Sequence, residues 1–321
     1  MKRFLWLSFA VILCLMLAAC QDSEALLTGA ATSGPAAAPS FTPAPLPTRT
    51  AEPAATSTLT PAPTARPSLT PQPICTATLT ATPTPPPCAE NGRLETFEIA
   101  SVLFKTPLRG LVYLPPCYDA SPAQSYPVLY LIHAMNRDEN QWVELGLPEA
   151  ADRLMQSGIV RPYLIVMPYD PSGWKQPAEM PFDLALVNDV IPYIDGRYHT
   201  QTDRAHRAVG GLSRGGGWAI HIGLLRWGLF SAMGAHSPGI FRDDAEHLKK
   251  WLERIPADSL PRIWVDIGES DHELLPSVLD FEALLTDKAV PHEWRLSPGY
   301  HDDRYWRKEL ETYLRWYGAE W

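Results

Sequence analysis

Residues 208–220 read AVGGLSRGGGWAI and contain a Gly-x-Ser-x-Gly motif, in which Ser213 lies between Gly211 and Gly215. The start of this segment is typical of a strand, and the part after Ser213 is typical of a helix. Glycines are needed on both sides because side chains there would collide where strand and helix cross. We therefore expect Ser213 on a tight strand-to-helix turn, with its hydroxyl exposed at the carboxyl end of the strand.

Strand and helix patterns alternate on both sides of this motif. Residues 128–132 and 163–167 are apolar without interruption, which predicts strands covered on both faces. Further strands are expected at 207–211, 230–234, 262–267 and 292–296, and helices at 148–157, 183–198, 214–225, 244–254, 278–288 and 304–317. Residues 94–104 and 110–114 are expected to form an antiparallel pair at the sheet edge. This order predicts an α/β fold with a mostly parallel central sheet and helices on both faces.

Two polar residues follow later strands at the same edge of the predicted sheet. Asp271 comes after the strand at 262–267, and His301 comes after the strand at 292–296. A serine hydroxyl becomes a nucleophile when a base takes its proton and an acid orients that base. The chain order Ser, Asp, His is the order of α/β-hydrolases. We therefore predict Ser213 as nucleophile, His301 as base and Asp271 as orienting acid.

Other carboxylates compete for the role of the acid. Asp266 is expected inside its strand, Asp302 is adjacent to His301, and Glu269 lies two residues before Asp271. Asp271 could instead cap the following helix. No spacing of His or Cys indicates a structural metal, and we expect neither a metal nor a cofactor.

Several segments together resemble the Putative esterase family. They are Val128–His133, Asp189–Tyr198, Gly210–Gly216, Gly268–Asp271 and Gly299–His301 with Trp306. The family groups feruloyl and acetylxylan esterases, S-formylglutathione hydrolase, enterochelin-type esterases and mycolyltransferase-like proteins. The resemblance covers most of residues 94–317 and implies an α/β-hydrolase fold with the same three catalytic residues.

The resemblance also implies two N–H donors for an oxyanion. One would be the N–H of Arg214, and the other an N–H just after His133. Family members usually have His-Gly where this chain has His133-Ala134-Met135, so the second donor is Met135 or Ala134, of which we prefer Met135. Arg214 stands where the family often has Met, which would place a cation near the nucleophile and favour an acidic or polar acyl group.

Three residues are predicted to contact the substrate. They are His133, Trp218 and Trp174, the last in a segment rich in Pro and Gly that could form a lid. The alternative for His133 and Trp218 is burial in the core.

The N-terminus indicates export. Lys2 and Arg3 precede an apolar run that ends in Leu17-Ala18-Ala19-Cys20. This pattern predicts a signal peptide at 1–19 and resembles the lipobox of bacterial lipoproteins, in which Cys20 would be lipidated. An ordinary signal peptide with a chance cysteine is the alternative. We expect an extracytoplasmic protein that meets the membrane only through its lipid.

The next segment has an unusual composition. Residues 28–87 contain 15 Pro and 15 Thr and almost no large apolar side chains. Such a segment cannot bury enough apolar surface to fold, so we predict a tether at 20–88 and a catalytic domain at 89–321. Among the remaining cysteines we prefer a Cys88–Cys117 disulfide, with Cys75–Cys88 as the rival.

The charge of the chain limits its partners. The net charge is −9, and no run of Lys and Arg follows the first three residues. Nucleic acid is therefore not expected as a partner. We predict an exported serine esterase that acts on a small-molecule or polysaccharide-linked ester. The alternatives are an acyltransferase of the same family and a catalytically idle module that binds the cell envelope.

Overall fold

The computed structural model describes residues 90–120 and 122–321. The predicted signal peptide at 1–19, the lipidation of Cys20 and the tether at 20–88 lie outside these residues and stay predictions, as does the domain boundary at residue 89. None of the helices that the structure describes has the length and hydropathy to cross a membrane.

The centre of the fold is an eight-stranded sheet with the order β1-β2-β4-β3-β5-β6-β7-β8. Pairs β1/β2 and β2/β4 are antiparallel, and the other neighbours are parallel. The strands are β1 (Arg93–Ile99), β2 (Leu108–Leu114), β3 (Val128–Ile132), β4 (Leu164–Pro168), β5 (Arg207–Leu212), β6 (Ala232–His236), β7 (Arg262–Gly268) and β8 (Glu293–Ser297). The predicted α/β-hydrolase fold, with its mostly parallel sheet, is confirmed.

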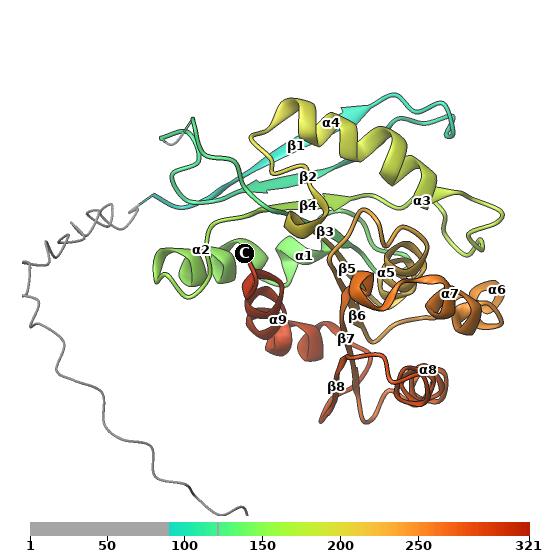
Figure 1. The fold of residues 1–321 in the computed structure, drawn as a ribbon. Coiled ribbons are helices and arrows are strands. Elements are labelled where there is room, and N and C mark those ends of the chain that lie inside the picture. The colour runs from blue at the N-terminus through green and yellow to red at the C-terminus, as the bar shows by residue number, and fades with distance from the viewer. Residues whose placement is uncertain (1–89, 121) are drawn as a thin grey trace, which may run out of the picture. The chain divides into compact units, whose positions relative to one another are not determined.

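Helices cover both faces of this sheet. They are α1 (Gln141–Glu144), α2 (Leu147–Gln156), α3 (Phe182–Ala185), α4 (Ile191–Arg197), α5 (Arg214–Leu225), α6 (Arg242–Ala245), α7 (Leu248–Arg254), α8 (Leu275–Asp287) and α9 (Asp303–Gly318). A π-helical turn at Leu186–Val190 joins α3 to α4, and short 3₁₀ turns occupy Arg204–His206 and Ala257–Ser259. Figure 1 shows α2 and α9 on one side of the sheet and α5, α7 and α8 on the other.

Alternate side chains of the central strands enter two separate hydrophobic cores. Tyr130 belongs to a cluster that includes Phe281 of α8. Its neighbour Leu131 belongs to a second cluster with Leu154 of α2 and Leu314 of α9. Burial on both faces explains why the predicted strand at 128–132 is apolar at every position.

Several element boundaries differ from the sequence predictions. The helix predicted at 244–254 is divided into α6 and α7. The helix predicted at 183–198 is interrupted by the π-helical turn, directly before Pro192 near the start of α4. Proline has no N–H to donate, so the regular helical hydrogen bonds cannot run through it. The strand predicted at 94–104 ends at Ile99, and the strand predicted at 230–234 begins at Ala232.

Cys117 is disulfide-bonded. The other four cysteines of the chain, Cys14, Cys20, Cys75 and Cys88, lie outside the described residues. The preferred pairing of Cys117 with Cys88 therefore stays a prediction.

A buried carboxylate ties α9 to the sheet. Asp266 of β7 is 1% exposed, and its Oδ2 accepts hydrogen bonds from the hydroxyls of Tyr305 and Tyr313, both at 2.7 Å. Its Oδ1 accepts from His236 Nδ1 at 2.7 Å and from Trp264 Nε1 at 2.8 Å. Burial, together with the nearby Asp266, raises the pKa of both tyrosines, so they remain protonated donors. Asp266 is therefore a structural acid inside its strand, as the sequence predicted.

The replacement Asp266→Ala should strongly destabilise the domain. It removes the carboxylate that accepts four buried hydrogen bonds, so the four donors lose this partner. We expect the free energy of unfolding to fall by about 3 to 5 kcal/mol. Denaturant unfolding of the two proteins measures the difference. The control is Asp258→Ala, at an exposed position, with an expected change within about 0.5 kcal/mol. A loss for Asp266→Ala as small as that of the control would show that the cluster contributes little to stability.

Candidate active site

Ser213 lies on the tight turn between β5 and α5. Its backbone angles are φ 55° and ψ −119°, which are strained for a residue with a side chain. The turn is possible because of Gly211 and Gly215. A β carbon on Gly211 would collide with the carbonyl of Gly215, and one on Gly215 would collide with the carbonyl of Ile132. The predicted strand-to-helix turn is therefore present.

The structure brings Ser213, His301 and Asp271 into one hydrogen-bonded chain. Ser213 Oγ lies 2.8 Å from His301 Nε2, and His301 Nδ1 lies 2.6 Å from Asp271 Oδ2. The carboxylate can only accept, so His301 carries its proton on Nδ1 and Nε2 is free to accept the serine proton. Asp271 is 2% exposed, while the His301 side chain is 32% exposed. The arrangement matches the geometry that a nucleophile, a base and an orienting acid need, and the three catalytic roles stay predictions.

Two of the three rival acids, Asp266 and Asp302, have other partners in the structure. Asp266 is enclosed in its own cluster. Asp302 accepts the N–H groups of Arg304 and Tyr305 and so caps the start of α9. Asp271 itself also accepts the Leu274 N–H through Oδ1 at 3.3 Å, so it partly has the capping role considered from the sequence.

A cavity of about 460 Å³ opens over Ser213 and His301. Its walls come mainly from the segment after β3 and from the start of α9. Lining residues include Met135, Arg137, Gln141, Asp303 and Trp306. Trp306 packs edge-on against the His301 ring, with ring centroids 4.9 Å apart. The cavity therefore combines the reactive groups with charged and polar walls.

Two backbone N–H groups are candidates for an oxyanion hole. Arg214 is the first residue of α5, so its N–H is one of those that a helix leaves without an internal acceptor. After β3, the Ala134 N–H donates to Gln141 Oε1 at 2.8 Å and is therefore already used. In the described part of the chain, no hydrogen bond from the Met135 N–H is found. This geometry favours Met135 over Ala134 as the second donor.

His133 orients the peptide that carries the Met135 N–H. Its Nδ1 donates to the Ala134 carbonyl at 2.7 Å, and its Nε2 accepts the Asp170 N–H at 2.8 Å. Because the N–H and C=O of one peptide point in opposite directions, holding the Ala134 carbonyl directs the Met135 N–H the other way. Burial lowers the pKa of His133, which keeps the ring neutral. His133 is 3% exposed with both ring nitrogens engaged, so the prediction that it contacts the substrate is wrong.

Asp170 is a second buried acid beside the site. Its Oδ2 accepts from Arg214 Nε at 3.0 Å and from Trp218 Nε1 at 2.7 Å. The Arg214 guanidinium also donates to the Lys175 carbonyl and is 6% exposed. Arg214 is therefore a buried cation paired inside the protein, and the predicted preference for an acidic or polar acyl group stays a prediction. Sequence reasoning missed Asp170, although its place just after β4 is a signal that could have found it.

Trp218 and Trp174 differ in how far their side chains are exposed. Trp218 is fully buried and bonded to Asp170, so its predicted contact with the substrate is wrong, and burial in the core is the correct alternative. Trp174 is 73% exposed and is not among the residues that line the cavity at Ser213. Its role as part of a lid stays a prediction.

No group of three or more His, Cys, Asp or Glu side chains placed to hold a metal occurs in residues 90–120 and 122–321.

The family model described as Putative esterase matches residues 101–317. The chain belongs to this family. The match includes Ser213, Asp271 and His301.

Two proteins whose names include esterase are similar in sequence to parts of the chain. A Xylanibacter ruminicola protein named Endo-1,4-beta-xylanase/feruloyl esterase is 34% identical over 149 residues, which cover 41% of this chain and 20% of that protein. A Mycobacterium tuberculosis protein named Esterase Rv1288 is 25% identical over 242 residues, which cover 59% of this chain and 51% of that protein. The chain thus spans about a fifth of the length of the first protein and about half of the length of the second.

Two solved structures, one titled an esterase and one a hydrolase, share the fold. One titled ferulic acid esterase has a TM-score of 0.64 and 25% identity, and the match covers 72% of this chain and 98% of that one. An S-formylglutathione hydrolase from Staphylococcus aureus has a TM-score of 0.57 at 16% identity, over 71% of this chain and 99% of that one.

The replacement Arg214→Met, toward the residue often found in the family, tests the buried ion pair. It leaves the Asp170 carboxylate buried with fewer donors, so we expect the free energy of unfolding to fall by about 3 to 5 kcal/mol. The control is Arg304→Met, because the Arg304 side chain is 85% exposed in its pair with Asp302. There we expect a loss below about 1 kcal/mol. Equal losses in chemical denaturation would contradict the structural role assigned to Arg214.

Proposed function

We propose that this chain is a serine esterase that hydrolyses a carboxylic ester through an acyl-enzyme. The observation that carries the proposal is the hydrogen-bonded chain from Ser213 through His301 to Asp271, with two backbone N–H groups beside it. Membership of the esterase family supports the reaction class. The same three residues also argue against an idle binding module, which would have no need of them.

In the first half of the proposed reaction, Ser213 Oγ attacks the carbonyl carbon of the ester. His301 Nε2 takes the hydroxyl proton as the new C–O bond forms, and Asp271 stabilises the resulting imidazolium. The carbonyl oxygen becomes an oxyanion that accepts hydrogen bonds from the N–H groups of Arg214 and Met135. The intermediate then breaks the bond to the alcohol oxygen, which leaves with the proton held on His301.

In the second half, water replaces the alcohol. His301 takes a proton from the water, the hydroxide attacks the acyl carbon, and a second oxyanion forms at the same two N–H groups. The bond to Ser213 Oγ breaks, and the serine recovers its proton from His301. Transfer of the acyl group to another hydroxyl would use the same steps with that hydroxyl in place of water.

The proposed substrate is a small-molecule or polysaccharide-linked ester. The support comes from the names of similar proteins, which include feruloyl esterases. The cavity lining mixes charged side chains with apolar ones such as Met135 and Trp306. Arg137 pairs there with Asp303 and Arg304 with Asp302, so these ion pairs bring no excess of either charge. This balance of charge suits a neutral substrate.

The proposed location is outside the cytoplasm. The support is the sequence alone: the predicted signal peptide at 1–19, the lipobox-like Cys20 and the Pro/Thr-rich tether at 20–88. We propose that lipid on Cys20 holds the enzyme on the membrane and that the tether gives it reach. We include neither a metal nor a cofactor in the reaction, and nucleic acid is not a proposed partner.

The replacement Ser213→Ala tests the nucleophile. It removes the only atom proposed to bond to the acyl group, so kcat for p-nitrophenyl and feruloyl esters should fall by about 10⁴-fold or more. A fluorophosphonate probe should label the unaltered protein and leave Ser213→Ala unlabelled. If the unaltered protein were inactive and unlabelled, the idle binding module would become the better proposal.

The replacement Asp271→Asn tests the orienting acid. The amide no longer holds His301 in the required tautomer, so kcat should fall by about 10³- to 10⁴-fold while KM changes little. The matched control is Glu269→Gln, at an exposed position, for which kcat should stay within about twofold. Steady-state kinetics on one p-nitrophenyl ester compares the two. If kcat fell further in Glu269→Gln than in Asp271→Asn, Glu269 would be the orienting acid.

A further inference from the structure

Gln141 connects the two loops that carry the reactive groups. We call residues 133–138, which follow β3, the oxyanion loop. Gln141 begins α1 and is 1% exposed, although its side chain is polar. Its Oε1 accepts the Ala134 N–H at 2.8 Å, and its Nε2 donates to Asp303 Oδ1 at 3.4 Å. Asp303 lies two residues after His301, so one side chain spans both loops.

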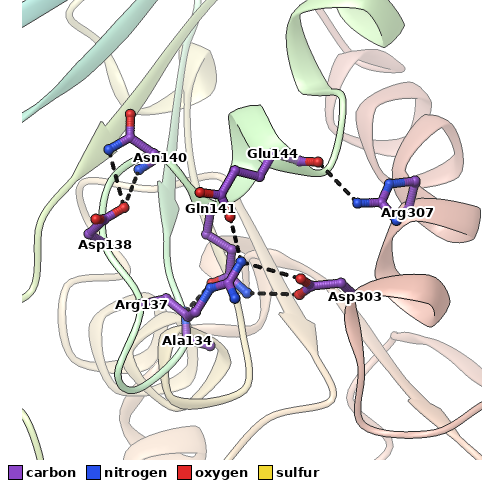
Figure 2. A network of polar contacts seen from close by, with 8 residues as sticks. All are labelled: Ala134, Arg137, Asp138, Asn140, Gln141, Glu144, Asp303 and Arg307. Carbon is purple, nitrogen blue, oxygen red and sulfur yellow. Dashed lines mark hydrogen bonds and ion pairs between the residues drawn. The ribbon is translucent and has the colours of Figure 1, made fainter.

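Arg137 forms a second link to the same carboxylate. Its Nη2 donates to Asp303 Oδ2 at 3.2 Å and to Glu144 Oε2 at 2.6 Å. Figure 2 shows Arg137 and Gln141 converging on Asp303. The two oxygens of Asp303 therefore have separate donors, both from the segment that begins with the oxyanion loop. We call Arg137, Gln141 and Asp303 the loop clamp.

The oxyanion loop needs such support. It contains no glycine, and Asn136 has φ 60°, a conformation that few residues with side chains adopt. Ala134 and Met135 offer two neighbouring N–H groups, and both residues line the cavity at Ser213. The contact with Gln141 engages the Ala134 N–H and leaves the Met135 N–H available.

We propose that Gln141 is a positioning residue that selects Met135 as the oxyanion donor and, through the loop clamp, holds this donor in register with His301. The inference rests on the proposed esterase function. Gln141 acts through the backbone of the oxyanion loop and does not itself touch the reacting atoms. Its loss should therefore lower the rate of the chemical step more than it weakens substrate binding.

The first test compares Gln141→Leu with Gln156→Leu. Gln156 lies at a partly exposed position on α2 away from the cavity, where its Nε2 donates to the Glu90 carbonyl and to Asn91. For Gln141→Leu we expect kcat to fall by about 10- to 100-fold with KM within about threefold. For Gln156→Leu both constants should stay within about twofold of the unaltered protein.

The second test exchanges the two partners. Gln141→Glu keeps an acceptor for the Ala134 N–H but places a second carboxylate against Asp303, so kcat should fall by about tenfold. The double variant Gln141→Glu/Asp303→Asn supplies an amide donor at position 303 and should recover kcat to within about threefold of the unaltered protein. A merely structural role for Gln141 would not produce this rescue.

The amide NMR signal of Met135 reports directly on the proposed oxyanion donor. The chain has seven Met, so labelling with ¹⁵N-methionine gives a simple amide spectrum in which Met135 can be assigned. The Met135 signal should move in Gln141→Leu and keep its position in Gln156→Leu. The result separates displacement of the donor from general loss of stability.

The outcomes distinguish this inference from the proposed function. If the unaltered protein neither hydrolyses esters nor reacts with a fluorophosphonate, the proposed function fails and the role of Gln141 fails with it. If the unaltered protein is active and Gln141→Leu keeps kcat within twofold and the Met135 signal in place, only the inference is overturned.

Discussion

The close crossing of β5 and α5 is the constraint on which the site depends. Gly211 and Gly215 allow the backbone of the helix to lie against β5 and the end of β3, where a single β carbon would collide with a carbonyl. Ser213 occupies the turn between them and must adopt a positive φ. This geometry exposes its hydroxyl at the carboxyl edge of the sheet and leaves the first N–H of α5 beside it. The proposed nucleophile and one proposed oxyanion donor thus come from one turn.

The surrounding chain supports this turn with buried carboxylates. Asp170 holds the side chain of Arg214 and, through its N–H, the ring of His133. It therefore touches the residues on both sides of the proposed oxyanion hole. Asp266 joins α9, which follows the His301 loop, to the sheet. Both acids are fully engaged with donors, and such satisfied networks favour one arrangement of the surrounding groups.

Much of the fold and of the site could be predicted from the sequence. Unbroken apolar runs identified the parallel strands, and the position of Asp271 and His301 after successive strands predicted that they would meet Ser213. The direction of a side chain depends on its tertiary neighbours, so Trp218 and His133 were assigned to the substrate although both are buried. For the same reason the pairing of Arg214 with Asp170 and the contacts of Gln141 could not be predicted from the sequence.

The central claim is that Ser213 forms a covalent acyl intermediate. The direct test is to mix the protein with p-nitrophenyl acetate, quench the reaction in acid within its first turnover, and locate the acetyl group by peptide mass spectrometry. The account predicts acetyl on Ser213 at early times and its loss as water completes the reaction. Product release with no acetyl on Ser213 at any time, or with acetyl on another residue, would contradict the account.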